Sequence, residues 1–254
     1  MFIPQVNLSK SKKDKIKGLT FPIELSSDLA YLCGVIAGDG SIYTRSSKHD
    51  YIIKCVGNPK DEKEYYNKIL SPLFRSLFKI KIKVKLQDQG STYGFVIYSK
   101  GLYGFFTKII GLPSGKKYIT LIIPNLFKKH KELCNSFIQG VADTDFCLSF
   151  KKKYSSVPYY PVISGCSKSK RFMKEISFEL KKQGFQIAEI YDYKVKDIRF
   201  KKGYSIINRI DLNGVNNYKL WLNQIGFRHP KHLKKIKKYS GEWTFKDMQM
   251  HIPI

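Results

Sequence analysis

Acidic residues are scarce in this 254-residue sequence, which has 20 aspartates and glutamates against 46 lysines and arginines, a formal net charge of +26. Charges of one sign at this density repel one another unless a polyanion neutralises them. The chain is nevertheless 43% hydrophobic, with 17 tyrosines and 17 phenylalanines. That composition excludes a disordered polycation, because disorder also requires low hydrophobicity. The basic residues therefore cover a folded body, and nucleic acid or an anionic membrane surface is the expected partner.

Long apolar runs are also missing. The longest nearly apolar stretch, residues 29–38, is about half of the roughly 20 residues that a membrane-spanning helix requires. Residues 1–4 show no charged segment followed by an apolar signal core. The five cysteines form no C-x-x-C pair, which argues against a disulfide framework and a zinc ribbon. These absences favour nucleic acid over membrane and predict a cytoplasmic (intracellular) location.

Arginine is rare as well, because 40 of the basic residues are lysine and 6 are arginine. Lysine acts mainly as a point charge on phosphates, whereas the planar guanidinium of arginine can pair with two acceptors of one base. We therefore expect contacts with the phosphate backbone to dominate affinity.

Two similar segments divide the chain into halves. Residues 29–42 read LAYLCGVIAGDGSI, and residues 135–148 read NSFIQGVADTDFCL. Gly34 and Asp39 match Gly140 and Asp145, with the same spacing in both copies. Each copy is predicted to be a helix, here called a motif helix, and the elements that follow repeat in the same order. The pattern indicates a duplicated αββαββα unit.

Apolar alternation and turn residues predict the remaining elements. In the first half we expect strands at residues 41–47, 51–56, 80–87 and 93–98, and helices at 61–78 and 102–110. In the second half we expect strands at residues 147–153, 159–166, 185–195 and 204–212, and helices at 169–183 and 215–225. Short turns between consecutive strands predict antiparallel sheets with helices on one face, an α+β fold. The predicted boundaries are a basic N-terminal extension (1–24), a first repeat (25–112), a linker (113–130), a second repeat (131–228) and a basic C-terminal tail (229–254).

Alternation also predicts which face each strand residue takes. The residues predicted to point into the core are Ile42, Thr44, Ile80, Ile82, Val84, Leu86, Leu148 and Phe150. The polar and cationic residues predicted to face nucleic acid are Ser41, Tyr43, Arg45, Lys81, Lys83, Lys85, Gln87, Ser149, Lys151 and Lys153. A solvated face whose lysines discourage edge pairing is the alternative. Recurrence in both halves, together with the net charge, favours nucleic acid. The two ends, including His229-x-x-His232, are interpreted as basic appendages that are solvated or lie along phosphates.

An aspartate ends each motif helix, where the negative end of the helix dipole makes a carboxylate unfavourable by about 0.3–1 kcal/mol. For one copy, an ordinary helix-ending turn at Asp39-Gly40 would explain the residue. The repeat at Asp145 instead indicates a compensating cation. Hard divalent ions such as Mg²⁺ bind carboxylate and carbonyl oxygens, and a helix C-terminus leaves carbonyls without intrahelical partners.

Small residues on the motif helices predict how the two aspartates meet. Gly34 with Gly38, and Gly140 with Thr144, have the spacing that gives each helix one smooth face for close packing. If the two helices pack on these faces, their acidic ends come together.

These residues resemble the motifs of the LAGLIDADG homing endonucleases, at residues 29–40 and 137–145, and the chain resembles the single-chain class with two motif copies. The resemblance implies that the motif helices form the domain interface and that two saddle-shaped sheets cover the DNA major groove. It also implies that Asp39 and Asp145 bind Mg²⁺ with help from Gly38 and Thr144. Mn²⁺ is expected to substitute, and Ca²⁺ to support binding only. The second copy departs from the motif, since Phe146 replaces the glycine found at Gly40.

The function implied is a monomeric, metal-dependent endonuclease that makes double-strand breaks at a long, specific site in double-stranded DNA. The family carries a basic residue near each metal, for which Lys54, Lys60 and Lys168 are candidates. A phosphate-binding or solvated role suits these lysines equally well. Asp143 is assigned a structural role or a role in supporting the metal ligands, because at i−2 from Asp145 it points to another side of the helix. An RNA maturase acting on intron RNA, or a non-catalytic DNA-binding regulator, could use the same fold, although the intact acids argue against the regulator.

Overall fold

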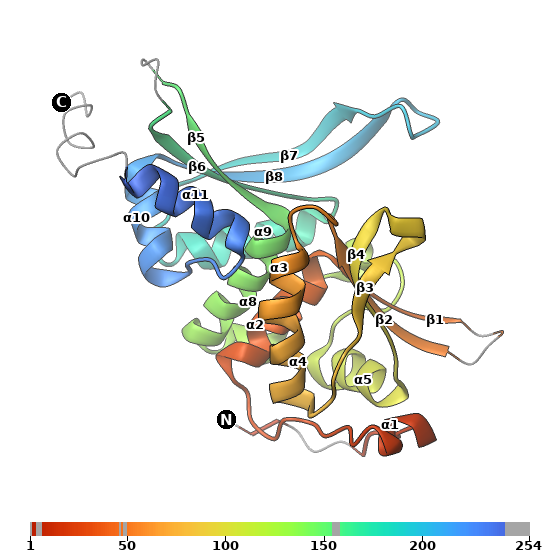
Figure 1. Ribbon diagram of the computed structural model, residues 1–254. Helices are drawn as coiled ribbons and strands as arrows, with labels where there is room; N and C mark the ends of the chain where they lie inside the picture. Colours follow the sequence, from red (N-terminus) through yellow and green to blue (C-terminus); the bar gives the residue numbers. More distant parts are fainter. Residues whose placement is uncertain (1, 4–6, 46, 48–49, 154–157, 242–254) are drawn as a thin grey trace. The chain divides into compact units, whose positions relative to one another are not determined.

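The computed structural model describes residues 2–3, 7–45, 47, 50–153 and 158–241, which form two compact units, residues 1–145 and 146–254 (Figure 1). The end of the predicted 41–47 strand and residues 242–254 of the predicted tail therefore lie partly or wholly outside the described residues. In the ranges that are described, no helix combines the length and apolar composition needed to cross a membrane.

The first unit is built on a four-stranded antiparallel sheet in the order β1-β2-β4-β3. Its strands are β1 (Gly40–Arg45), β2 (Asp50–Gly57), β3 (Val84–Gln87) and β4 (Thr92–Tyr98). Its helices include α1 (Lys12–Ile16), α2 (Ser27–Gly38), α3 (Lys63–Tyr65), α4 (Ser71–Phe78) and α5 (Lys100–Gly104). Three more follow, α6 (Lys117–Thr120), α7 (Asn125–Lys128) and α8 (Lys131–Asp145).

The second unit repeats the design with strand order β5-β6-β8-β7. It comprises β5 (Phe146–Lys151), β6 (Tyr160–Ser167), α9 (Lys170–Lys181), β7 (Ile187–Lys196), β8 (Tyr204–Asn213), α10 (Gly214–Gln224) and α11 (Pro230–Gly241). Counted from the motif helices α2 and α8, both halves follow the order αββαββα. The predicted α+β fold and its internal repetition are confirmed.

The core forms where apolar strand residues meet helices, as alternation predicts. On β1, Ile42 is buried between the partly exposed Ser41 and Tyr43. Aromatic rings fill the space behind the first sheet, where Phe74 and Phe95 pack edge to face with ring centroids 5.0 Å apart. In the second unit Trp221 is fully buried and contacts Phe146, at a centroid distance of 6.0 Å. Both sheets therefore have one apolar face covered by helices.

Two inward predictions are wrong at strand ends. The strand expected at 80–87 begins only at Val84, so Lys81 and Lys83 precede β3, although both are exposed. Leu86 is 51% exposed because β3 is a short strand at the sheet edge. Thr44, next to the last residue of β1, is exposed too. Alternation predicts the face of a residue but not whether a helix covers that part of the sheet.

The predicted 61–78 helix is continuous despite Pro72. A π-helical segment (Tyr66–Leu70) joins α3 to α4, and Pro72 lies in the first turn of α4. A proline ring normally clashes with the carbonyl one turn earlier and removes one backbone donor. The wider π turn directly before Pro72 provides room for the ring. A second π-helical segment (Phe105–Ile110) extends α5 over the rest of the predicted 102–110 helix.

A few buried residues hold the two basic ends on their units where these ends are described. Asp14 of α1 is buried, and its carboxylate accepts hydrogen bonds from the backbone nitrogens of Ser11 (2.9 Å) and Gly101 (3.0 Å). At the other end His229 and His232 are each 1% exposed. Most lysines of these segments are exposed, and the buried Asp14, His229 and His232 side chains hold the segments on their units.

Candidate functional site

The two motif helices are in backbone contact within the first unit. A Cβ atom added at Gly34 would collide with the carbonyl oxygen of Phe137 and lie 3.0 Å from the Val141 nitrogen. A Cβ atom at Gly140 would collide with the carbonyl of Tyr31 in the same way. Each glycine of one helix therefore faces the backbone of the other. No residue larger than glycine fits at either position without separating the helices.

This packing brings the acidic ends of the helices together. Asp39 caps the C-terminus of α2, and Asp145 is the last residue of α8. A Cβ atom at Gly38 would lie 3.3 Å from the Asp145 carboxylate oxygen Oδ2 and would collide with Thr144 Oγ1. The Asp145 carboxylate thus lies against the last turn of α2, one residue before Asp39. Both aspartates are half-buried.

A lysine absent from the sequence-based candidates also reaches this point. Lys117, at the start of α6, donates from Nζ to the carbonyl oxygens of Ala37 (2.9 Å), Gly40 (2.8 Å) and Gly38. Burial lowers the pKa of Lys117, and the nearby charge of Asp145 and then of Cys55 and Asp39 opposes that shift. Its ammonium group therefore sits on the carbonyls of Ala37 and Gly38, which the end of α2 leaves without intrahelical partners, and on the carbonyl of the first residue of β1.

The linker before α6 positions Lys117. The backbone nitrogen of Gly115 donates to the carbonyl of Ile42 in β1 (2.7 Å), which fixes the linker beside the end of α2. Gly115 has φ +82°, a conformation that favours glycine. Beyond α6, Leu121 and Ile123 are buried. The sequence contains one signal for this arrangement, the Gly115-Lys116-Lys117 turn in the linker, but nothing in it indicates a contact with β1.

Each of the three lysines proposed from sequence has a local partner in the structure or is exposed. Lys54 forms an ion pair with Asp88, with Nζ 2.6 Å from Oδ1, on the face where it opposes Ser41. Lys60 is exposed in the turn after β2, where its backbone nitrogen donates to Asn58. Lys168 in the second unit lies over the ring of Phe200, 4.7 Å from its centroid.

Asp143 belongs to the interior of the helix pair. Its carboxylate oxygen Oδ2 accepts a 2.6 Å hydrogen bond from the Tyr31 hydroxyl, which is also 2.7 Å from the Tyr65 hydroxyl. All three residues are fully or almost fully buried. Burial, followed by the neighbouring Tyr31 and Asp143, raises the pKa of Tyr65 well above its usual value. This network links α8 to α2 and α3, on a different side of α8 from Asp145.

The outward face of the first sheet carries the predicted polar residues of β1. Ser41 lies opposite Lys54, and Arg45 lies opposite Asp50. The Arg45 guanidinium is held by Asp50 Oδ2 at 2.8 Å and by the Tyr98 hydroxyl at 3.3 Å. On β3, Lys85 is exposed and Gln87 is partly exposed. The face therefore presents donors fixed by neighbouring side chains.

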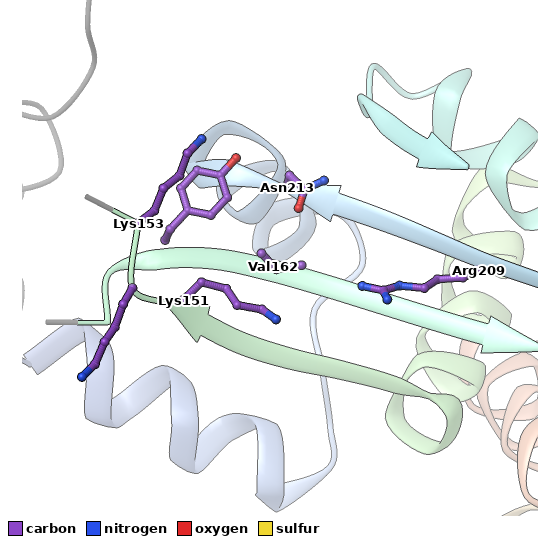
Figure 2. Close-up of a pocket in the computed structure, with 7 residues that line it drawn as sticks. Lys151, Lys153, Val162, Arg209 and Asn213 are labelled. Atoms are coloured by element: carbon purple, nitrogen blue, oxygen red, sulfur yellow. The ribbon is translucent and has the colours of Figure 1, made fainter. Parts of the chain in front are cut away.

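On the second sheet the outward face contains a cavity of about 480 Å³, called here the cationic cavity (Figure 2). Ser149 and Lys151 of β5 share this face with Val162 and Tyr160, which lie directly opposite them. Arg209 is held by Asp211, with Nε 2.8 Å from Oδ1. The cavity is lined by Lys151, Lys152, Lys153, Tyr160, Val162, Arg209 and Asn213.

The donor atoms at the ends of α2 and α8 suit a hard divalent cation. Within the described part of the chain, no three histidine, cysteine, aspartate or glutamate side chains converge as a metal-binding group. An ion here would depend on the carboxylates of Asp39 and Asp145 together with backbone carbonyls. Oxygen donors of this kind are those that Mg²⁺, Mn²⁺ and Ca²⁺ prefer.

Comparisons with known proteins agree with this architecture. No family model matches the chain. The chain is 25% identical over 201 residues to the uncharacterized protein MJ0314 of Methanocaldococcus jannaschii, covering 78% of this chain and 70% of that protein. That similarity assigns no activity.

The solved structures identify the fold as that of the LAGLIDADG homing endonucleases. The homing endonuclease I-DmoI in complex with DNA and Ca matches with a TM-score of 0.56 and 17% identity, over 84% of this chain and 97% of that one. A further structure of mesophilic I-DmoI variants matches with a TM-score of 0.54 and 18% identity, over 79% and 95% of the two chains. At this identity the match establishes the fold, and the activity is argued separately.

Proposed function

We propose that this chain is a metal-dependent, site-specific DNA endonuclease that makes double-strand breaks at a long target. One observation carries the proposal: two aspartates end two helices whose backbones touch, and the charges of both act on Lys117. A purely structural helix pair gains nothing from acids at two helix C-termini, where the dipoles disfavour them.

Asp39 and Asp145 are proposed to hold divalent metal, with the carbonyls of Gly38 and Thr144 as further ligands. Bound divalent metal supplies an activated water and neutralises charge on the scissile phosphate. The two carboxylates would hold that metal, and the closely packed helices keep the two acidic helix ends together. I-DmoI was crystallised in complex with DNA and Mn, and a variant of it with target DNA in the presence of Mg. We extend metal use to this chain on the strength of its own oxygen donors.

Double-stranded DNA is the proposed partner of the outward sheet faces. Support comes from the net charge of +26 and from the lysines and arginines that line these faces. Arg45 and Arg209 are each held by an aspartate, which fixes the direction of the guanidinium donors. Preset donors lose less side-chain entropy on binding. The proposed DNA-facing residues remain Ser41, Tyr43, Arg45, Lys81, Lys83, Lys85, Gln87, Ser149, Lys151 and Lys153.

The test begins with cleavage of a random or genomic DNA library in Mg²⁺ or Mn²⁺, from which the target is recovered. On that target we expect Asp39→Asn and Asp145→Asn each to abolish double-strand cleavage while leaving binding in Ca²⁺ largely intact. Asp28→Asn, at the opposite end of α2, is the matched control and should cut normally.

Near-normal cleavage by either site variant would make that acid structural and remove the shared-site proposal. If the protein cuts no DNA with either metal but binds an intron RNA tightly, the maturase alternative replaces it.

A further inference from the structure

The hairpin formed by β7 and β8 leaves the second sheet as a two-stranded ribbon (Figure 1). The pairing of β6 with β8 ends at Ser167 opposite Asn208, whereas β7 continues to pair with β8 as far as Lys196 opposite Tyr204. The major groove of B-DNA is wide enough to admit a two-stranded β-ribbon. The residues on the outward face of this ribbon therefore decide what it could recognise there.

An apolar strip runs along that outward face. It begins at Ile190, which lies opposite Arg209 of the cationic cavity. Toward the tip Tyr193 lies opposite Ile207, and Val195 follows on the same face. Ile190, Tyr193 and Val195 are 40%, 55% and 36% exposed, and Ile207 is partly exposed. These four residues, here called the apolar strip, continue the surface of the cationic cavity.

A β-bulge keeps Ile190 and Tyr193 on one face although three positions separate them in the chain. Within the bulge Asp192 has φ +56°, and its backbone nitrogen donates to the side-chain oxygen of Asn208 (3.1 Å). Asn208 is buried, and its amide nitrogen donates to the carbonyl of Ser167 (3.3 Å). The buried amide therefore fixes the bulge and, with it, the direction of the strip.

The first sheet carries polar residues where the second carries the strip. The two sheets can be aligned through their registers, starting from the matched strands β1 and β5. Three outward positions then differ in chemistry: Lys85 corresponds to Ile190, Gln87 to Tyr193 and Thr92 to Ile207. Lysine, glutamine and threonine side chains can hydrogen-bond to base edges, whereas isoleucine offers apolar contact alone. The repeat has kept the positions of these side chains and changed what they can contact.

We propose that the apolar strip binds the C5-methyl groups of thymines in the major groove, so that the half of the target under the second sheet requires thymine at those positions. This inference rests on the proposed function, because it specifies which duplex an outward face recognises. The thymine methyl is the apolar group that base pairs present in the major groove. A strip without hydrogen-bonding side chains at Ile190 and Ile207 matches that group.

Charge favours DNA over another apolar surface as the occupant of the strip. Arg209 lies at one end of the strip, and the exposed Lys194 and Lys196 alternate with its residues along β7. Each of the four carboxylates in residues 187–213 forms an ion pair with a lysine or arginine. Cations on the back of a ribbon suit the phosphates that border the groove. An apolar strip with a cationic surround therefore complements a duplex.

Replacing thymine by uracil tests the contact without changing the protein, because uracil lacks the methyl group and keeps the hydrogen-bonding groups. Duplexes are first selected from a random library by binding to the full chain in Ca²⁺. The thymines of the preferred duplex are then replaced one half at a time. In one half we expect binding to weaken by about fourfold for each contacted methyl, the equivalent of roughly 0.8 kcal/mol per buried carbon. Replacement in the other half should have little effect.

Ile190→Ser tests the same contact from the protein side. It should lower the ratio of the affinities for the thymine and uracil duplexes by up to about fourfold. Ile206→Ser is the matched control, because Ile206 is 45% exposed on the same ribbon but lies opposite Lys194 on the other face. This control should keep the ratio of the wild type. Circular dichroism checks that both variants are folded.

Preferred duplexes without recurrent thymines would overturn the inference, as would a wild-type ratio near one in both halves or a ratio that Ile190→Ser leaves unchanged. Self-association that Ile190→Ser abolishes in sedimentation experiments would also overturn it, since a second copy of the chain would then cover the strip.

The result is separable from the proposed function, because every ratio is measured by binding in Ca²⁺. Cleavage that Asp39→Asn abolishes would support the endonuclease whatever uracil does. A methyl effect that depends on Ile190 would stand even if no DNA were cut.

Discussion

Gly34 and Gly140 set how closely the motif helices approach. The helices can touch because glycine has no Cβ atom. Adding a methyl group at either position forces the helices apart, because the obstacle is a backbone carbonyl that cannot rotate away. We expect Gly34→Ala and Gly140→Ala each to lower the free energy of unfolding of the first unit by about 1–3 kcal/mol. Chemical denaturation followed by circular dichroism measures the change.

Gly104→Ala is the matched control for that experiment. It also lies in a helix, but an added Cβ would meet only the end of the Leu8 side chain, at 3.2 Å. Better helix propensity should offset this small contact, so the variant should be close to neutral. Equal stability of all three variants would contradict the backbone contact between α2 and α8.

At the residue scale the sequence indicates that Asp39 and Asp145 end the motif helices, but it does not indicate which lysines contact them. Asp39 and Asp145 stand out because each ends an apolar helix and the pattern occurs twice. Lys117 does not stand out, since its contact depends on a hydrogen bond between Gly115 and Ile42, far apart in the chain. The ion pair of Lys54 is not visible in the sequence either, since its partner Asp88 comes from the turn after β3. Pairings of this kind require the tertiary structure.

At the scale of elements, α11 shows how a basic segment can be part of the core. His232 of this helix stacks on Phe227, with ring centroids 4.3 Å apart, and Tyr239 stacks on Phe150 at 4.1 Å. Lys235 reaches from the same helix to the carbonyl of Leu148 in β5 (2.9 Å). The lysine-rich sequence conceals this helix, because the apolar contacts come from histidine and tyrosine rings.

The buried histidines predict an acid-sensitive second unit. Burial, together with nearby lysines, lowers the pKa of His229 to about 3 and that of His232 to about 2. The ordinary value is near 6.5, so below that pH the unfolded chain takes up protons that the folded chain does not. Stability should be constant above about pH 6.5 and fall as the pH is lowered toward 3, by up to about 1.4 kcal/mol per pH unit for each histidine.

Urea denaturation at pH 7 and pH 5, followed by tryptophan fluorescence, measures this effect, because Trp221 is fully buried in the second unit. His232→Phe keeps a ring against Phe227 but cannot be protonated, so its stability should depend less on pH. The same stability of the wild type at both values would show that the histidines are not kept neutral.

Periodicity predicts the order of the elements better than it predicts their boundaries. The order of strands and helices follows from alternation and from the repeat. The π-helical segment before Pro72 and the late start of β3 do not, because both depend on how much space neighbouring elements leave. Alternation identified the outward residues of β1 and β5, whose register places them beside Lys54 and Tyr160.

At the scale of the whole molecule, charge should govern DNA affinity. A protein that contacts 6–10 phosphates binds more weakly as salt rises, with a slope of about −0.9 per neutralised phosphate in a double logarithmic plot. Replacing both Lys151 and Lys153 by glutamine removes two charges at the cationic cavity. The slope should become shallower by about 0.9 for each phosphate that the variant no longer neutralises.

Lys182→Gln is the control for the salt titration, because Lys182 follows α9 and pairs with Glu179 on the helical side of the second unit. Its slope should match the wild type on specific and scrambled duplexes. A slope that is unchanged by the double substitution as well would mean that the cationic cavity does not contact phosphates.

The outward face of the second sheet also carries cysteine thiols that a reagent can modify. Of the five cysteines, Cys33, Cys55 and Cys134 are buried, whereas Cys147 and Cys166 are exposed. Cys147 lies opposite Ser164, and Cys166 lies opposite Arg209, so both thiols share the face that carries the cationic cavity. An alkylating reagent should therefore modify these two thiols in the native protein and spare the other three. If duplex DNA slows the alkylation of both thiols, this face is the one that DNA covers, and no substitution is needed to show it. Equal rates with and without DNA would show that the duplex lies elsewhere.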